Sequence, residues 1–188
     1  MNFKGAEELR IPVFSTLREA SSAGPFDCIT MWHSLEHIPD PVGAFEQIHK
    51  LLAPDGVLVC AVPDAQGWQA RTFGKHWFHL DVPRHIYHFG DRSLAALFDR
   101  TGFQVIKKWH QEWEYDVFGW CQSGLNKIFS KPNLFFSLLT GKKPKMTAAG
   151  KLANLALGSV CTAAAIPATA LSTLAGQGGT IIYAGRRR

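Results

Sequence analysis

The segment from Phe26 to Pro63 constrains the fold more than any other part of the chain. An apolar run over 26–32 ends in a polar turn, an amphipathic stretch follows from Val42 to Leu52, and a second apolar run covers 57–62. Short β-branched runs predict buried strands, and apolar residues spaced by three or four predict a helix between them. This order of strand, helix and strand indicates an open α/β sheet.

Polar side chains directly follow the first of these strands. His33, Glu36 and His37 come immediately after the apolar run. Ligands of open α/β sheets bind beyond the carboxyl ends of the strands. The i, i+3, i+4 spacing also brings the three side chains to one side of a helical turn. We therefore expect a small-molecule site at this loop.

The rest of the chain extends the same pattern. A helix is predicted over 2–10, and further strands are predicted at 12–15, 103–109 and 180–185. Asp91 begins a helix that ends before Gly102. The residues 53–56 form a turn by their Pro and Gly chemistry. The sequence therefore predicts an α/β fold with a mainly parallel sheet.

The segment 111–176 departs from this alternation. It combines aromatic residues, a lysine-rich stretch and an alanine-rich run from Leu152 to Ala175 without any charge. The run is long enough to span a bilayer, but its Ser, Thr and Asn side chains and Pro167 argue against a span. A helical hairpin on a membrane surface, a lid over the site and a packed helix pair all stay open. We expect 1–110 with 177–188 to form one α/β domain, and 111–176 to form a helical insert.

Charge is divided unevenly along the chain. All 15 acidic residues lie at or before Asp116, whereas nine Lys and Arg residues follow it. A region that is both basic and apolar favours an anionic membrane surface as partner. No nucleic acid is expected as partner, because the basic residues lie among Ala and Leu. The four separated cysteines predict buried, reduced thiols, and the polar N-terminus predicts a cytoplasmic protein, peripheral on the inner face of the membrane.

Several motifs resemble one family when they are taken in order. The first is Phe-Asp-x-Ile-Thr-x-Trp-His-x-Leu-Glu-His-x-x-Asp-Pro from Phe26, followed by Leu-x-Pro-x-Gly-x-Leu-x-x-x-Val-Pro. Asp-Val-Pro-Arg-His-Ile-Tyr-His-Phe from Asp81 and Leu-Phe-Asp-Arg-Thr-Gly-Phe from Leu97 come next. Over about residues 1–108 and the last strand, the chain resembles class I S-adenosylmethionine-dependent methyltransferases. The resemblance implies a Rossmann-like sheet, an antiparallel last strand and S-adenosyl-L-methionine as cofactor.

One part of the family pattern is absent. Members begin with a strand and a Gly-x-Gly-x-Gly loop, whose glycines let the backbone approach the cofactor. No Gly-x-Gly precedes Phe26. The sheet is therefore expected to be truncated on its N-terminal side, whether through a late start, a gene fragment or a shortened protein. The strand at 26–32 should then keep an unpaired edge, which invites self-association, and the cofactor should bind weakly or not at all.

The resemblance also implies roles for individual residues. The cofactor would contact Thr16, Leu17, Met31, Trp32 and His33. The candidates for a catalytic base are His37, His85 and His88, because imidazole titrates near neutrality. The acceptor would contact Trp77, Arg84 and Tyr87. A divalent metal would bind His33, Glu36 and His37, although these residues are more simply explained as braces of the loop.

Two functions follow from these expectations. The first is methyl transfer to a hydroxyl of a small or lipid-linked acceptor, which depends mainly on positioning. The second is a non-catalytic module of methyltransferase fold that binds a membrane or a partner chain. The retained His and Glu loop favours the first function, whereas the missing glycine loop favours the second.

Overall fold

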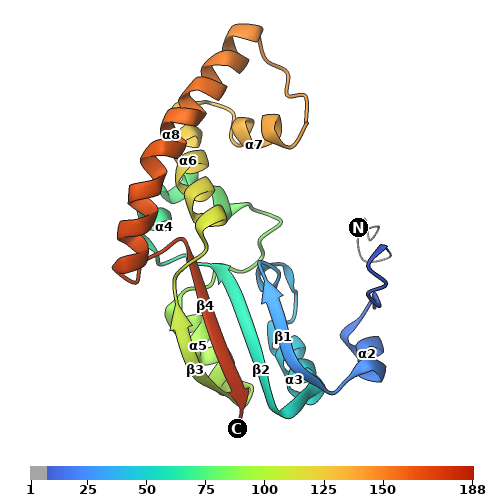
Figure 1. Cartoon of the computed structure of the whole chain (residues 1–188). Helices are drawn as coiled ribbons and strands as arrows, with labels where there is room; N and C mark the ends of the chain where they lie inside the picture. Colours follow the sequence, from blue (N-terminus) through green and yellow to red (C-terminus); the bar gives the residue numbers. More distant parts are fainter. Residues whose placement is uncertain (1–7) are drawn as a thin grey trace.

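The computed structural model of the chain describes residues 8–188 (Figure 1). Its strands are β1 (Phe26–Trp32), β2 (Leu52–Pro63), β3 (Phe103–Trp109) and β4 (Thr180–Arg187). Its α-helices are α2 (Leu17–Ala20), α3 (Pro41–Leu51), α4 (Trp68–Phe73), α5 (Asp91–Arg100), α6 (Trp113–Ile128), α7 (Leu134–Leu139) and α8 (Ala148–Leu174). Short 3₁₀ turns are η1 (Ser21–Ala23), η2 (Leu35–His37), η3 (Gly74–His76) and η4 (Phe78–Leu80).

The four strands form one sheet in the order β1-β2-β4-β3. β1 pairs with β2 in parallel, and β4 lies antiparallel to both of its neighbours, β2 and β3. The antiparallel last strand and the edge position of β1 confirm two predictions. Among the described strands β1, β2 and β3 run in one direction and β4 runs opposite to them, as predicted, but β4 lies between β2 and β3, so two of the three pairs are antiparallel.

Helix α3 connects the two parallel strands, as the sequence predicts. Its N-cap is Asp40, whose side chain accepts a hydrogen bond from the Gly43 N–H at 2.9 Å, and Pro41 occupies the first turn, where no N–H is needed. The predicted turn at 53–56 is instead part of β2. It forms a bulge, because Phe26 pairs with Leu52 while Cys28 pairs with Val57, so extra residues loop out on β2.

The hydrophobic core lies on one face of the sheet. α3 and α5 cover this face, which lies at the back in Figure 1. The side chains of Phe45, Leu58, Phe98, Phe103 and Ile181 are almost completely buried there. Burial of this kind contributes about 1.5–3 kcal/mol per large side chain. This layer fixes the register of β1 and β2 and so positions the loop after β1.

The opposite face of the sheet is open along β1, whereas residues 180–185 of β4 are buried on both faces. Cys28, Thr30 and Trp32 alternate along β1 with their side chains exposed, and Val59 beside them is only half-buried. The prediction of a buried thiol is therefore wrong for Cys28, although Cys60 and Cys121 are buried. Helices on both faces are usual for parallel sheets, and here the second layer is incomplete.

The predicted strand at 12–15 is wrong. Residues 11–14 have no regular secondary structure, and Ile11, Val13 and Phe14 are exposed. No strand of the described residues lies beside this segment, so its backbone has no ladder to join. The helix predicted over 2–10 lies mostly outside the described residues, which begin at Glu8.

The segment between β3 and β4 is helical, in agreement with the sequence. α6, α7 and α8 stand beyond the carboxyl ends of β1, β2 and β3 (Figure 1). The alanine-rich run is not a hairpin or a helix pair, because α8 continues as one helix through Pro167. The Thr147 side chain caps its first turn, and the helix packs along α6.

A buried carboxyl group ties this insert to the sheet. Asp116, in the first turn of α6, accepts hydrogen bonds from the Thr180 hydroxyl at 2.8 Å and from the Gly179 N–H at 3.3 Å. The Gln69 side chain donates to the Asp116 carbonyl at 2.7 Å. Burial raises the pKa of Asp116 to about 7, against the opposing effect of the Thr180 and Gly179 hydrogen bonds. α4, α6 and β4 are therefore joined through one residue, Asp116, by its backbone carbonyl and its carboxyl group.

Candidate functional site

A polar cavity of about 260 Å³ lies at the carboxyl end of β1, where the sequence predicts a site. Its walls come from the loop after β1, from the segment around η4, from the start of α6 and from α7. The lining residues are His33, Glu36, His37, Phe78, His79, Asp81, Arg84, His85, Tyr115 and Phe136. Four imidazoles, two carboxyl groups and one guanidinium thus surround one small volume.

Backbone contacts hold the two polar segments together. The His33 N–H donates to the Ala61 carbonyl at 3.0 Å, which extends the β1–β2 ladder by one residue. The Glu36 carbonyl accepts from the N–H groups of Ile86 and Tyr87 at 3.0 and 3.3 Å. His33 itself has a φ of 45°, a left-handed conformation that costs a non-glycine residue free energy. The turn aims its ring into the cavity.

Glu36 is the most unusual side chain of the site. It is 2% exposed, and neither carboxyl oxygen has a hydrogen-bond partner. Burial raises the pKa of Glu36, against the opposing effect of nearby His37 and Arg84. A buried polar group without a partner costs about 1–3 kcal/mol. The carboxyl group is therefore suited to receive a hydrogen-bond donor or a cation from a ligand.

Two histidines face Glu36 with their Nε2 atoms available. The Nδ1 atoms of His85 and His37 lie 2.7 and 2.9 Å from the carbonyl oxygens of His79 and Arg84. These contacts place the proton on Nδ1, so that Nε2 has the free lone pair. His85 Nε2 lies 3.9 Å from a Glu36 oxygen and 3.9 Å from an Asp81 oxygen. Both imidazoles can therefore accept a proton or bind a cation.

The same three residues fit a divalent metal ion. Ligand atoms of Glu36, His37 and His85 all lie within 4.8 Å of one another. Metal-binding histidines usually donate their other ring N–H to a carbonyl or carboxylate, as both do here. The set predicted from the sequence contained His33 in place of His85. His33 Nδ1 lies 3.8 Å from Glu36, while its Nε2 is buried without a partner.

His33 and His79 form the neutral side of the cavity. The His33 ring stacks on Tyr115 with centroids 4.1 Å apart and on His79 at 6.2 Å. Burial lowers the pKa of His33 to about 4, and the neighbouring His85 and His37 add to this effect. Burial, with His33 and His85, lowers the pKa of His79 to about 3. Both rings are therefore neutral at physiological pH.

A much larger apolar groove adjoins this cavity. Its volume is about 770 Å³, and it shares Phe78, Tyr115 and Phe136 with the polar cavity. The remaining walls come from α6, from α7 and from Thr162 and Ile166 of α8. A ligand with a polar head and a hydrocarbon part would fill the two adjoining spaces together.

The remaining residues predicted to catalyse or to bind the acceptor lie around the rim or behind it. His88 is exposed, and its Nε2 lies 2.9 Å from the Leu80 carbonyl. Arg84 reaches the rim, where it pairs with Asp81 at 2.5 Å. Tyr87 is 41% exposed and donates to the Pro39 carbonyl, and Trp77 is buried behind the site. His88, Trp77 and Tyr87 do not line the polar cavity.

The five residues predicted to bind the cofactor do not all lie in one place. Met31 and Leu17 pack into the core layer, and the Thr16 hydroxyl caps α2. Trp32 is 44% exposed on the open sheet face, and His33 faces the cavity. Trp32 and His33 fit one wall of an S-adenosylmethionine site. The described residues before β1 include no glycine-rich turn that could cradle the rest of the molecule.

Several site residues were not singled out from the sequence. Asp81, Tyr115, Phe78 and Phe136 complete the cavity. Tyr115 belongs to a conspicuous aromatic run, but nothing in that run indicates that it stacks on His33. Asp81 precedes the Arg84–His88 cluster by three residues, and this proximity was the available signal.

Comparison with known proteins assigns a family to this architecture. Residues 6–108 match the family described as "Methyltransferase domain". A ubiquinone biosynthesis O-methyltransferase of Psychrobacter cryohalolentis is 50% identical over 40 residues, which are 21% of this chain and 16% of that relative. A protein of the same name from Xanthomonas axonopodis pv. citri is 28% identical over 92 residues, 46% of this chain and 38% of that relative.

The solved structures agree at the level of the fold. A protein from Galdieria sulphuraria, named provisionally as a sarcosine dimethylglycine methyltransferase, superposes with a TM-score of 0.51 at 12% identity. The superposition covers 98% of this chain and 63% of that one. The chain spans less than two fifths of the length of the two curated relatives compared above. With more than half of its length matched by the family model, and with the fold of these enzymes, the chain belongs to the class I methyltransferase domain family.

Proposed function

We propose that this chain supplies the acceptor side of an S-adenosylmethionine-dependent O-methyltransferase whose substrate is amphiphilic. The observation that supports this most directly is the position of His85. Its Nε2 lone pair faces a polar cavity that continues into an apolar groove. The names of the two relatives, both O-methyltransferases of ubiquinone biosynthesis, agree with a hydroxyl acceptor.

His85 is the residue best suited to take a proton from the acceptor hydroxyl. The His79 carbonyl fixes its tautomer, and Asp81 at 3.9 Å stabilises the imidazolium that forms. Burial lowers the pKa of His85 against the opposing effect of these two groups. The ring is therefore neutral, and able to act as a base, throughout the physiological range. A positioned general base contributes about 10²–10⁴-fold to a rate.

Glu36 and the aromatic walls would orient the acceptor. The two unpartnered Glu36 oxygens can accept a hydrogen bond from a second hydroxyl of the head group. Phe78, Tyr115 and Phe136 lie between the polar and the apolar spaces and would contact the ring or chain of the acceptor. The bound S-adenosylmethionine supplies the electrophilic methyl group, for which Trp32 and His33 provide one wall. Close positioning of the acceptor hydroxyl against this methyl group would supply most of the remaining rate acceleration.

A divalent ion is the alternative occupant of the same three side chains. Glu36, His37 and His85 would hold it, and it would lower the pKa of an acceptor hydroxyl and orient that hydroxyl. In that case His85 could not also serve as the base. The two mechanisms therefore predict different responses to chelator.

The first test is the binding of an alkylated dihydroxybenzene, measured by titration calorimetry against the same ring without the alkyl chain. We expect the alkyl chain to strengthen binding, because it would fill the apolar groove. His85→Gln and Glu36→Gln should weaken the binding of the head group. His88→Gln is the matched control, because His88 lies outside the cavity. Equal affinity for both probes, or no effect of either site variant, would contradict the proposal.

The second test is methyl transfer to the alkylated probe at millimolar S-adenosylmethionine, a concentration chosen to offset the weak cofactor binding expected of this chain. His85→Gln should lower the rate by about 10²–10⁴-fold, and His88→Gln should not. As pH falls, the rate should decline below pH 6.5, because the pKa of His85 is lowered. A rate that EDTA abolishes and added Mn²⁺ or Zn²⁺ restores would assign the metal mechanism in place of the free base.

A further inference from the structure

The polar and apolar faces of α8 are reversed relative to those of a surface helix in water. The side chains that turn toward the protein and are buried are Asn154, Gly158, Ala165, Thr169 and Ser172. The large side chains that point away are Leu152, Leu157, Val160, Leu171 and Leu174, with exposed fractions of 71%, 38%, 66%, 61% and 85%. A helix on the surface of a soluble domain normally buries its apolar stripe.

These exposed residues share one side of the helix. At 100° per residue, Leu152, Val160, Leu171 and Leu174 fall within about a third of a turn of one another, and exposed alanines occupy the positions between them. We name this surface, with Leu157 at its border, the outward face of α8. The buried residues lie on the opposite side. No described segment covers the outward face.

An uncovered surface of this kind indicates a partner. Contiguous apolar patches are rare on monomeric soluble proteins and mark contacts with proteins or membranes. Small residues where helices pack and polar residues turned inward are also characteristic of helices in lipid. Here Gly158 packs against Phe135 of α7, and the Thr162 hydroxyl donates to the Gly158 carbonyl at 2.8 Å.

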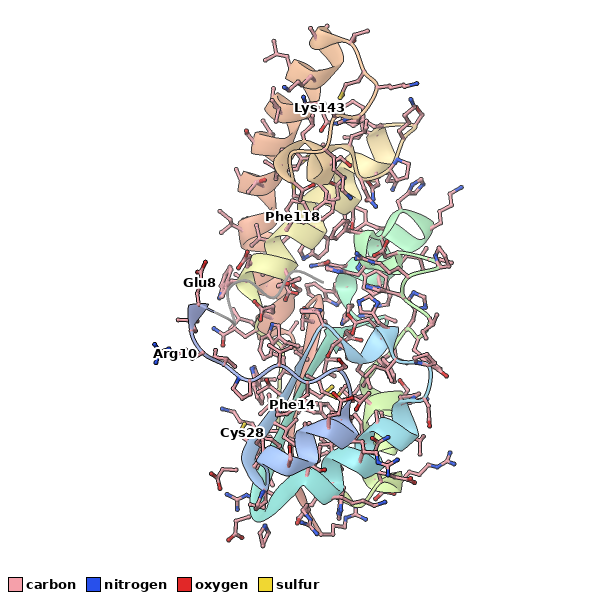
Figure 2. All side chains as sticks on the ribbon, turned by 90° about the vertical axis from the view of Figure 1, so that its right-hand side faces the viewer. Glu8, Arg10, Phe14, Cys28, Phe118 and Lys143 are labelled. Atoms are coloured by element: carbon pink, nitrogen blue, oxygen red, sulfur yellow. The ribbon has the colours of Figure 1, made fainter. Side chains whose placement is uncertain are left out.

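The charge of the insert identifies the kind of partner. No acidic residue follows Asp116, and Lys142, Lys143 and Lys145 occupy the loop that leads into α8. All three are exposed, and Lys143 lies near the end of the insert that is farthest from the sheet (Figure 2). Anionic lipid headgroups attract such side chains by about 1 kcal/mol each.

The geometry favours a helix that lies on the membrane over one that crosses it. By length and composition, α8 is the one described helix that could cross a bilayer. However, α6 packs along it and has Glu114 and Asp116 in its first turn. Crossing would carry these acids toward the hydrocarbon, whereas a helix lying in the interface leaves them on the protein side.

We propose that the outward face of α8 inserts into the surface of an anionic membrane, with the neighbouring lysines on the lipid headgroups. The test is co-sedimentation of the whole chain with vesicles of phosphatidylcholine alone or mixed with phosphatidylglycerol. We expect binding to the mixed vesicles that weakens as salt is added, because ions screen the lysines. Val160→Asp with Leu171→Asp should reduce this binding at least about tenfold, because burial of two charges opposes insertion.

The matched control is Ile106→Asp, which places a charge on an exposed apolar side chain of β3, outside the insert. It should bind vesicles like the wild type. Circular dichroism checks that each variant keeps its helices. A double variant that is folded and binds as well as the wild type would overturn the proposal, as would a wild type that binds no vesicles.

The lysines and the oligomeric state provide two further outcomes. Lys142→Glu, Lys143→Glu and Lys145→Glu together should remove the preference for anionic vesicles. If this triple variant keeps that preference, the assignment of an anionic partner is wrong. If the wild type binds no vesicles and sediments as a dimer that the Val160 and Leu171 double variant dissociates, the outward face is an interface between copies of the chain.

Discussion

Asp116 should make the stability of the chain depend on pH in a defined direction. Its pKa is raised from 3.8 to about 7, so the folded state keeps a proton that the unfolded state releases above pH 3.8. Stability from this group is therefore greatest at low pH and is lost as pH rises toward 7. In Asp116→Asn the side chain is neutral throughout. The free energy of unfolding of the variant should therefore rise relative to that of the wild type, by up to about 4 kcal/mol as the pH increases from about 4 to 8.

Urea denaturation of both proteins across this range measures the difference. The histidine cluster titrates in both proteins and therefore cancels in the comparison. Free energies of unfolding that stay parallel from acid to neutral pH would show that Asp116 ionises normally in the folded protein.

At the level of single residues, the sequence indicated half of the site. His33, Glu36 and His37 could be placed together, because they follow one strand at helical spacing. The approach of His85 to Glu36 could not be predicted, because 48 residues separate them and only the packing of the 78–88 segment brings them together. His88 lies outside the cavity, where its ring is hydrogen-bonded to the Leu80 carbonyl. No sequence pattern predicts this contact.

Two glycines of neighbouring helices should respond in opposite ways to alanine. At Gly158 of α8 an added Cβ would collide with the Phe135 ring, whereas at Gly124 of α6 it would meet nothing within 4 Å. Gly158→Ala should therefore destabilise by about 1–3 kcal/mol. Gly124→Ala should stabilise by about 0.5–1 kcal/mol through helix propensity. Thermal or urea unfolding measures both, and equal effects would mean that α7 does not hold Phe135 against α8.

The open edge of β1 predicts concentration-dependent association. β1 pairs only with β2 among the described strands, so alternate backbone groups of β1 face outward without partners. Sedimentation velocity should show dimers or larger species that Thr30→Lys reduces, since a charge on an edge strand opposes pairing. Thr30→Val, which keeps the strand apolar, is the control. A wild type that remains monomeric at every concentration would contradict this prediction.

The sequence correctly predicted those strands and helices whose local pattern is matched by a neighbouring element to pack against. β1, α3, α5 and β3 begin and end within a residue or two of the predicted bounds. The 12–15 segment has a strand-like sequence and no neighbour to pair with, so its pattern alone could not form a ladder. In α8, Pro167 counted against a membrane span, but the helix continues through it, and the proline is exposed on the outward side.

For the molecule as a whole, cofactor affinity is the decisive property. Trp32 and His33 offer one wall, while the sheet face around them stays open. We therefore expect titration calorimetry with S-adenosylhomocysteine to give binding weaker than micromolar, or none. Dissociation constants in the micromolar range or below would show that the glycine-rich turn of the family is dispensable here.

The place of β4 in the sheet also sets the timing of folding. Among the described strands, β4 alone joins β2 to β3, yet it begins 71 residues after β3 ends. At about 5–20 residues per second of synthesis, β3 therefore waits roughly 4–14 s for its neighbour. Until then the nascent chain consists of a β1–α3–β2 unit and a separate β3, each with apolar surface exposed to chaperones. Slow translation across the α6–α8 region would lengthen this vulnerable interval, so the yield of folded protein should depend on the codons of the insert.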